Sequence, residues 1–127
     1  MAVNRGMNAR HGRQFRELVG LVLETEGFPE AEARPAAARL SDAFDPDLPA
    51  TDITGIPGVT VHVRADAAPA WSTSLDMAER AAALDGNEHA LLVEYRRTRS
   101  GGEAYALMSL EGWARLARKA LGEVNVP

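Results

Sequence analysis

An acid, an imidazole and a guanidinium, three groups that could do chemistry together, lie in the stretch TDITGIPGVTVHVRA, residues 51–65. A Gly-Ile-Pro-Gly turn separates an apolar run from a second run in which valine alternates with polar residues. This alternation predicts a strand, and the turn predicts a hairpin. Asp52, His62 and Arg64 would then lie near one another on adjacent strands, as a catalytic site, as the remains of one, or as the polar side of an ordinary sheet.

Arginine is concentrated in a few short segments. Arg13 and Arg16 lie near the start of the chain, and Arg96, Arg97 and Arg99 lie in the run RRTRSGG between two predicted strands. A guanidinium presents a planar fork of donors that fits a phosphate group. The run therefore forms either a solvated hairpin tip or a phosphate contact, and the sequence leaves both open. A net charge of −4 argues against indiscriminate binding to nucleic acid but allows a local phosphate-binding surface.

Several other kinds of site are excluded by residue type or spacing. The chain has no cysteine, which excludes disulfides, thiolate metal ligands and cysteine nucleophiles. His11, His62 and His89 lack a metal-binding spacing such as HExxH. Neither a phosphate-binding glycine loop nor a GxSxG nucleophile turn occurs. We expect Trp71 and Trp113 in the core rather than in a base-stacking site, because each lies at helical spacing with apolar residues.

The composition is that of one globular domain, with 127 residues, 46% of them hydrophobic and 25% charged. No apolar run approaches the roughly 20 residues of a membrane helix, and the first residues lack the apolar segment of a signal peptide. We therefore expect a cytoplasmic protein with no membrane partner. Its expected organisation is a mobile polar arm at residues 1–11, a single domain at 12–122 and a tail at 123–127.

The periodicity of apolar residues predicts the order helix, strands, helix, two strands, helix. The expected helices cover residues 13–26 and 69–84 and a last segment that Ser109 can cap. The expected strands cover residues 51–56 and 59–64 and the runs HALLVEY and EAYALMSL. Residues 29–50 could contain a short strand or a helix. This order predicts an α/β or α+β fold, with a mixed β-sheet flanked by helices.

Residues 12–121 resemble the small Holliday-junction-resolvase-like members of the PD-(D/E)XK nuclease superfamily, especially those of phages. The resemblance rests on the helix opening GRQFRELV, the strand and turn DITGIPG, a helix containing Trp71, the strand LLVEYRR and the ending YALMSLEGWARLARKAL. It implies a restriction-endonuclease-like core, a homodimer, and cleavage of DNA with Mg²⁺ held by acids. For a phage-encoded protein it also implies the cytosol of the host cell.

The catalytic pattern that the resemblance implies is largely substituted in this chain. The pattern needs an Asp, a Glu-x-Lys on the next strand, and a Glu just after the phenylalanine of the first helix. Asp52 matches, whereas His62 and Arg64 stand at the positions of the Glu and the Lys. Arg16 stands at the helix position, with Glu17 displaced by about 100° around the helix.

These substitutions weaken the chemistry that such a site requires. Mg²⁺ prefers hard oxygen ligands, and an arginine that stays protonated cannot readily act as a base. We therefore expect a degenerate active site with no cofactor. Asp52 would remain either as a weak metal ligand or as the salt-bridge partner of Arg16 and Arg64.

The leading hypothesis is a non-catalytic nuclease-fold protein of phage origin that binds nucleic acid, including branched DNA, or a protein partner. The arginines expected to make these contacts are Arg13, Arg16, Arg64, Arg96, Arg97 and Arg99.

Two other functions remain open from the sequence. One is an active structure-selective endonuclease that binds Mg²⁺ or Mn²⁺. Its metal ligands would be Glu17 or the acids of a nearby loop, Asp42, Asp45 and Asp47. The other is a protein-binding inhibitor of a host factor that uses the acidic segment 41–52.

Overall fold

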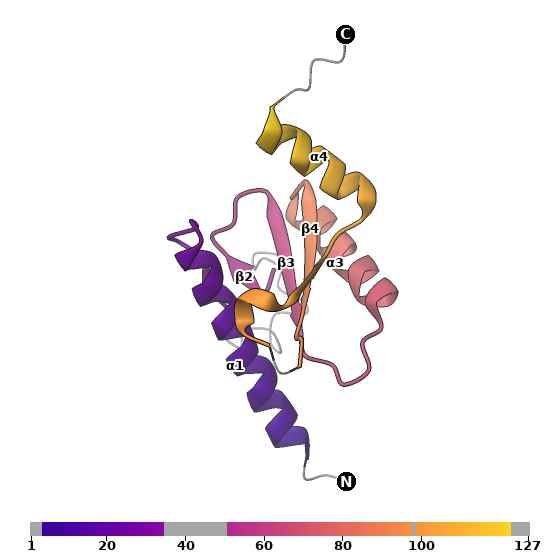
Figure 1. Cartoon of the computed structure of the whole chain (residues 1–127). Helices are drawn as coiled ribbons and strands as arrows, with labels where there is room; N and C mark the ends of the chain where they lie inside the picture. Colours follow the sequence, from indigo (N-terminus) through magenta and orange to yellow (C-terminus); the bar gives the residue numbers. More distant parts are fainter. Residues whose placement is uncertain (1–3, 35–50, 98, 123–127) are drawn as a thin grey trace.

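The computed structural model describes residues 4–34, 51–97 and 99–122, and its elements follow the predicted order (Figure 1). The helices are α1 (Asn4–Thr25), α3 (Trp71–Asp85) and α4 (Leu110–Leu121). The strands are β1 (Glu32–Ala33), β2 (Ile53–Thr54), β3 (Val59–Arg64), β4 (His89–Glu94) and β5 (Tyr105–Leu107). A short 3₁₀ helix, η2 (Gly101–Glu103), precedes β5. The described residues form a mixed α+β structure, which confirms the predicted class.

The main sheet is mixed and has the strand order β3-β4-β5. β3 and β4 run parallel, with Arg64 opposite Glu94, whereas β5 runs antiparallel to β4. Parallel neighbours need a crossover connection, and α3 supplies it. The carboxyl ends of β3 and β4 therefore lie side by side at one end of the sheet. β1 and β2 form a separate antiparallel pair.

Different helices cover the two faces of this sheet, with α1 on one side and α3 on the other (Figure 1). Successive strand residues point to opposite faces, so Val61 and Val63 both face α1 and form a core cluster with Phe15. Full burial of such an apolar side chain contributes about 1.5–3 kcal/mol. On the other face, the hydroxyl of Thr60 donates to the carboxylate that ends α3, at 3.2 Å.

α1 begins at Asn4, well before the expected start at residue 13, and so includes most of the segment expected to be a polar arm. Its end is as predicted. Gly27 follows it with a φ of 128°, and the N–H of Phe28 donates to the carbonyl of Leu23 at 2.9 Å. Within the described parts of the chain, no helix is long and apolar enough to cross a membrane.

The segment that contains Asp52 runs beside β3, but the expected hairpin of strands 51–56 and 59–64 is not formed, because β2 covers only Ile53–Thr54 and belongs to a different sheet from β3. The N–H of Asp52 donates to the carbonyl of Val61 at 2.7 Å, while β2 itself pairs with β1. In the turn, Gly55 has a φ of 85°, and a Cβ there would lie 2.1 Å from the carbonyl oxygen of Glu30. Only glycine fits this turn, because any side chain would clash with the backbone.

α4 begins as predicted from its sequence. The hydroxyl of Ser109 accepts a hydrogen bond from the N–H of Gly112 at 3.0 Å, which caps the helix. Glu111 in the first turn and Arg118 and Lys119 in the last turn complement the helix dipole.

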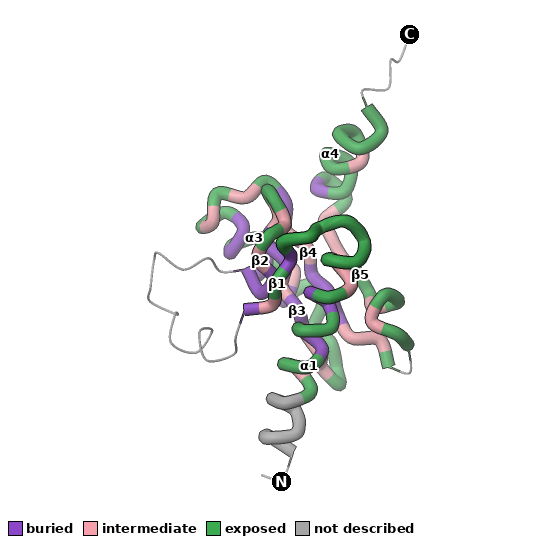
Figure 2. The backbone as a smooth tube through the Cα atoms, turned by 90° about the vertical axis from the view of Figure 1, so that its left-hand side faces the viewer, coloured by how far each residue is buried: buried purple, intermediate pink, exposed green. Residues whose placement is uncertain are grey.

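The orientation of α4 differs from the expectation. The helix meets the rest of the protein through its polar side, where Gly112 is buried and Lys119 pairs with Glu88. Its apolar side is exposed, and the helix is green along most of its length in Figure 2. Trp113 is 58% exposed, so the core position expected for it is wrong. Helical spacing identifies an apolar face but does not say whether the protein body covers it.

Candidate functional site

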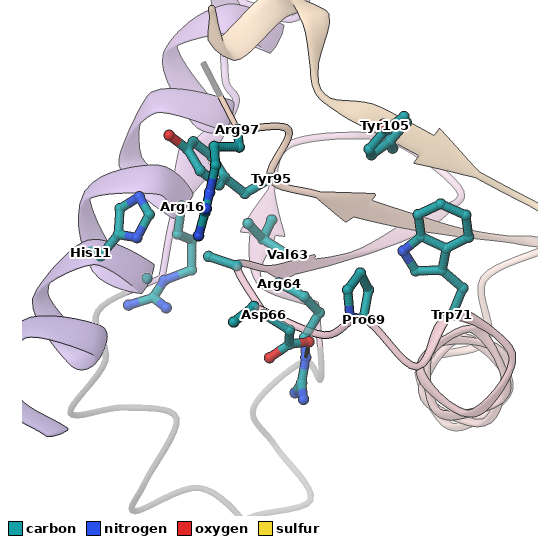
Figure 3. Close-up of a pocket in the computed structure, with 13 residues that line it drawn as sticks. His11, Arg16, Val63, Arg64, Asp66, Pro69, Trp71, Tyr95, Arg97 and Tyr105 are labelled. Carbon is teal, nitrogen blue, oxygen red and sulfur yellow. Dashed lines mark hydrogen bonds and ion pairs between the residues drawn. The ribbon is translucent and has the colours of Figure 1, made fainter. Parts of the chain in front are cut away.

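A cleft of about 870 Å³ opens at the carboxyl ends of β3 and β4 (Figure 3). α1 lines one side of it, and the segment after β3 together with the first residue of α3 lines the other. In α/β sheets, ligands commonly bind at the carboxyl ends of parallel strands. The cleft also lies within the size range of small-ligand sites, so it is the first place to look for function.

Positive charge dominates the lining of the cleft. Among the described residues, Arg16, Arg64 and Arg97 line it with a single carboxylate, that of Asp66, in a chain whose net charge is −4. Arg16 is buried, and its Nε donates to the carbonyl of Arg34 at 3.0 Å, which fixes the side chain against the wall. Guanidinium groups gathered in a concave surface attract anions.

Asp52 is buried and is not among the residues that line the cleft. Its Oδ2 accepts a hydrogen bond from the N–H of Val63 at 2.8 Å, and its carbonyl accepts one from the N–H of Arg34 at 2.9 Å. These bonds tie Asp52 into the backbone beside β3. Its carboxylate therefore has a structural task whether or not it has a chemical one.

The four positions that correspond to the catalytic positions of the family, only one of which keeps its residue, do not form a metal site. Arg16 and Arg64 line the cleft. His62 is half-buried in β3 and Asp52 is buried, and neither lines the cleft. One carboxylate, one imidazole and two guanidiniums do not fit Mg²⁺, which needs several hard oxygen ligands. Among the described residues, no three His, Asp or Glu side chains are grouped to hold a metal ion.

The acids that could have replaced the missing ligands are not brought to the cleft where the structure describes them. Glu17 is exposed and lies on another surface, with Glu24 and Glu32, because one residue step turns a helix by about 100°. The candidate loop acids, Asp42, Asp45 and Asp47, lie outside the described residues, as does most of the segment 41–52. The endonuclease and inhibitor hypotheses that depend on them therefore stay predictions.

The arginines of the RRTRSGG run have three different environments. Arg97 lines the cleft. The guanidinium of Arg96 lies 5.1 Å from the ring centroid of Tyr105, and Arg99 pairs with Glu103 through Nη1 and Oε2 at 3.2 Å. The structure thus groups Arg97, and not Arg99, with the other cleft arginines. Arg13, also expected to bind a partner, is exposed on α1 and does not line the cleft.

A buried acid lies directly behind the cleft. Glu94, the last residue of β4, is 0% exposed, and its Oε2 accepts a hydrogen bond from the N–H of Asp66 at 3.0 Å. Its Oε1 has no hydrogen-bond partner among the described residues. Burial raises the pKa of Glu94, and the Asp66 carboxylate adds to this, whereas the Asp66 N–H and Arg64 act in the opposite direction.

Arg64 forms an ion pair with Asp66. Its Nε contacts Oδ2 of Asp66 at 3.2 Å, and the side chain is about one third exposed. We expected Asp52 as its salt-bridge partner, but in the described part of the chain the carboxylate that pairs with Arg64 is that of Asp66. The reason is position, since Asp66 follows the end of β3 whereas Asp52 is turned into the backbone.

Aromatic rings form another part of the cleft lining. Trp71, the first residue of α3, and Tyr105 of β5 have ring centroids 5.4 Å apart and planes tilted by 59°. Trp71 is 40% exposed, so the core position expected for it is wrong as well. It stands at the start of α3, beyond the part of the helix that packs on the sheet. Tyr95 contacts His11 edge-to-face, with centroids 4.7 Å apart, which brings His11 to the wall of the cleft.

Three residues of this region were missed in the sequence. Glu94 carried a usable signal, because a lone acid in an apolar strand such as HALLVEY is costly to bury unless it has a task. Asp66 carried a weaker signal, because it is an acid just after a predicted strand. Tyr105 reaches the cleft only because β5 pairs with β4, opposite Glu94, and strand pairing cannot be deduced from spacing.

Comparisons with protein-family models, with curated proteins and with solved structures found no match to this chain. Function must therefore be inferred from the fold and from the chemistry of the cleft. The resemblance to PD-(D/E)XK nucleases remains a hypothesis that rests on the sequence motifs.

Proposed function

We propose that this protein is a non-catalytic nuclease-fold protein of the PD-(D/E)XK type that binds nucleic acid through its cleft. The supporting observation is the gathering of Arg16, Arg64 and Arg97 at the carboxyl ends of β3 and β4 in a chain with a net charge of −4. Guanidinium forks match the geometry of phosphate. Phosphates recur along a nucleic acid strand, so one ligand can engage several of these arginines at once.

The arrangement of elements supports the nuclease-fold part of the proposal. The resemblance implies a mixed sheet flanked by helices, and the chain has α1 and α3 on opposite faces of such a sheet. The motif DITGIPG places Asp52 beside β3, next to the strand that carries the two substituted positions, His62 and Arg64.

The chemistry of the same positions supports the absence of catalysis. Arg64, where a Lys would orient or deprotonate water, stays protonated near neutral pH and pairs with Asp66. Asp52 is engaged by the N–H of Val63. Two guanidiniums next to a single family carboxylate repel a divalent cation.

Fluorescence anisotropy with labelled four-way, flapped and linear DNA, in chelator and at low salt, tests binding through the cleft. The double variant Arg64→Gln/Arg97→Gln should weaken binding roughly tenfold or more, because two phosphate contacts are lost. The matched control is Arg13→Gln/Arg80→Gln, which removes the same charge from exposed positions outside the cleft and outside α4. Equal losses in both double variants, or no binding of any DNA by the native chain, would contradict the proposal.

We also propose that two copies of the chain pair through α4, as the resemblance implies a homodimer. The exposed apolar side of this helix, which includes Leu110, Trp113 and Leu121, would be buried in such a pair. The opposite charges at the two ends of α4 favour a second copy, in an antiparallel arrangement, as the partner. This arrangement places Glu111 in the first turn of each helix near the basic residues in the last turn of the other.

A further inference from the structure

The cleft has two chemically different ends (Figure 3). Arg16 and Arg97 lie at the end next to α1, and Trp71 and Tyr105 lie at the other end. Arg64 lies beside Asp66, with its guanidinium directed away from the aromatic rings. Guanidiniums suit an anionic group, whereas indole and phenol rings suit a flat apolar one. A ligand that fills the whole cleft must therefore carry both kinds of group a short distance apart.

The aromatic end has exposed ring surface available to a ligand. Trp71 and Tyr105 are 40% and 39% exposed. Their rings contact each other at a tilt, and both side chains line the cleft (Figure 3). Pro69 adds an apolar surface beside them. Arg96, over the ring of Tyr105, adds positive charge at this end. Aromatic rings so placed offer a stacking surface for another flat ring.

We infer that the cleft binds unpaired nucleotides of a single-stranded nucleic acid, with phosphates of the strand on the cleft arginines and a base stacked against Trp71 and Tyr105. This inference rests on the proposed function and narrows it to strands with free base faces. A base inside a duplex has both faces covered by its neighbours, so a duplex could use the arginines but not the aromatic end.

The tryptophan content of the chain makes the inference directly measurable. There are two tryptophans, and Trp113 lies on α4, outside the cleft. In a Trp113→Phe background, all tryptophan emission therefore comes from Trp71. The probes are an oligothymidylate of about 12 nucleotides, which is within the usual site size, an abasic oligonucleotide of the same length and a blunt duplex.

We expect oligothymidylate to quench the emission of Trp71 and the duplex and abasic strand to leave it nearly unchanged. Trp71→Ala should weaken binding of oligothymidylate roughly tenfold, and binding of the abasic strand less than twofold, because only the base stacks. Trp71→Phe should recover most of the loss, since it restores a ring. Leu84→Ala, an exposed truncation elsewhere on α3, should change neither affinity. Circular dichroism melting verifies that each variant is folded.

The outcomes separate this inference from the proposed function. Arginine-dependent binding of all three probes with equal affinity, unaffected by Trp71→Ala, would overturn the inference and leave the proposed function standing. No binding of any probe at low salt would overturn both. Quenching of Trp71 by an acidic peptide but not by oligothymidylate would also overturn both, and would assign the cleft to a protein partner.

Discussion

The carboxylate of Asp52 accepts a hydrogen bond from the N–H of Val63, and the backbone of Asp52 bonds to Val61 and Arg34. A residue with these contacts stabilises the fold even if no metal ion ever binds it. Its presence at the one matching family position is thus not evidence of catalysis. At the residue scale, the test is whether removal of this carboxylate lowers the free energy of unfolding or abolishes a catalytic activity.

We predict that Asp52→Ala lowers the free energy of unfolding by about 1–3 kcal/mol, because the buried N–H of Val63 loses its acceptor. Asp52→Asn keeps an acceptor oxygen and should lose less. Urea unfolding measures both, with Asp76→Ala, an exposed acid on α3, as the control. Unchanged stability in Asp52→Ala would show that the carboxylate is not a structural element.

Glu94 gives the protein a predictable pH dependence. Its pKa is raised above the ordinary value of 4.5, chiefly by burial. The folded state therefore favours the protonated form, and this contribution to stability is complete below pH 4.5 and is lost as pH rises through the raised pKa. Glu94→Gln keeps an acceptor for the Asp66 N–H and cannot ionise.

Urea unfolding across pH therefore compares the native chain with Glu94→Gln. We expect the free energy of unfolding of the native chain to fall relative to that of the variant as pH rises above 4.5, and then to level off. A difference that is constant with pH, or that has the opposite sign, would contradict the raised pKa.

At the scale of elements, periodicity and capping residues predicted most of the helices and strands. Ser109 caps α4 as predicted, and α3 ends close to the predicted residue 84, where Gly86 adopts the left-handed conformation. The early start of α1 was not predictable from apolar spacing, because the expected periodic pattern begins only near residue 13. The direction that the apolar side of α4 faces was not predictable either, because it depends on tertiary packing.

Pairing through α4 is an element-scale prediction. Light scattering should give twice the mass of the 13.6 kDa chain at micromolar concentration, and the monomer for Leu110→Ser/Trp113→Ser. The variant removes the exposed apolar surface that the pair would bury. Arg80→Gln, on α3, is the control and should stay dimeric. A native chain that is monomeric at high concentration would contradict pairing.

At the scale of the whole molecule, the arrangement of charge is more informative than its total. The cleft collects residues from four separate elements, α1, β3, α3 and β5, and from the connections that follow β3 and β4. Its three arginines therefore lie far apart in the sequence, at positions 16, 64 and 97. Each of them is a candidate by residue type, but the sequence does not distinguish them from the other candidates, Arg13, Arg96 and Arg99. The selection depends on the parallel pairing of β3 with β4, which brings Arg64 and Arg97 to the same end of the sheet.

Salt dependence tests this arrangement. We predict that affinity for DNA falls steeply with salt, and that the plot of log affinity against log salt becomes shallower by about two in Arg64→Gln/Arg97→Gln, one for each phosphate contact. The control double variant Arg13→Gln/Arg80→Gln should keep the native slope. An unchanged slope in the cleft variant would mean that the DNA binds elsewhere.

The most direct test of the proposal, that a nuclease fold binds DNA without cutting it, is one titration in which both binding and cleavage of the DNA are measured. Labelled four-way, flapped and linear DNA are incubated with the native chain in Mg²⁺ and in Mn²⁺, and each sample is divided between a binding gel and a denaturing gel. We predict shifted complexes, lost in Arg64→Gln/Arg97→Gln, with every strand intact. Metal-dependent cleavage that disappears in Asp52→Ala would contradict this prediction.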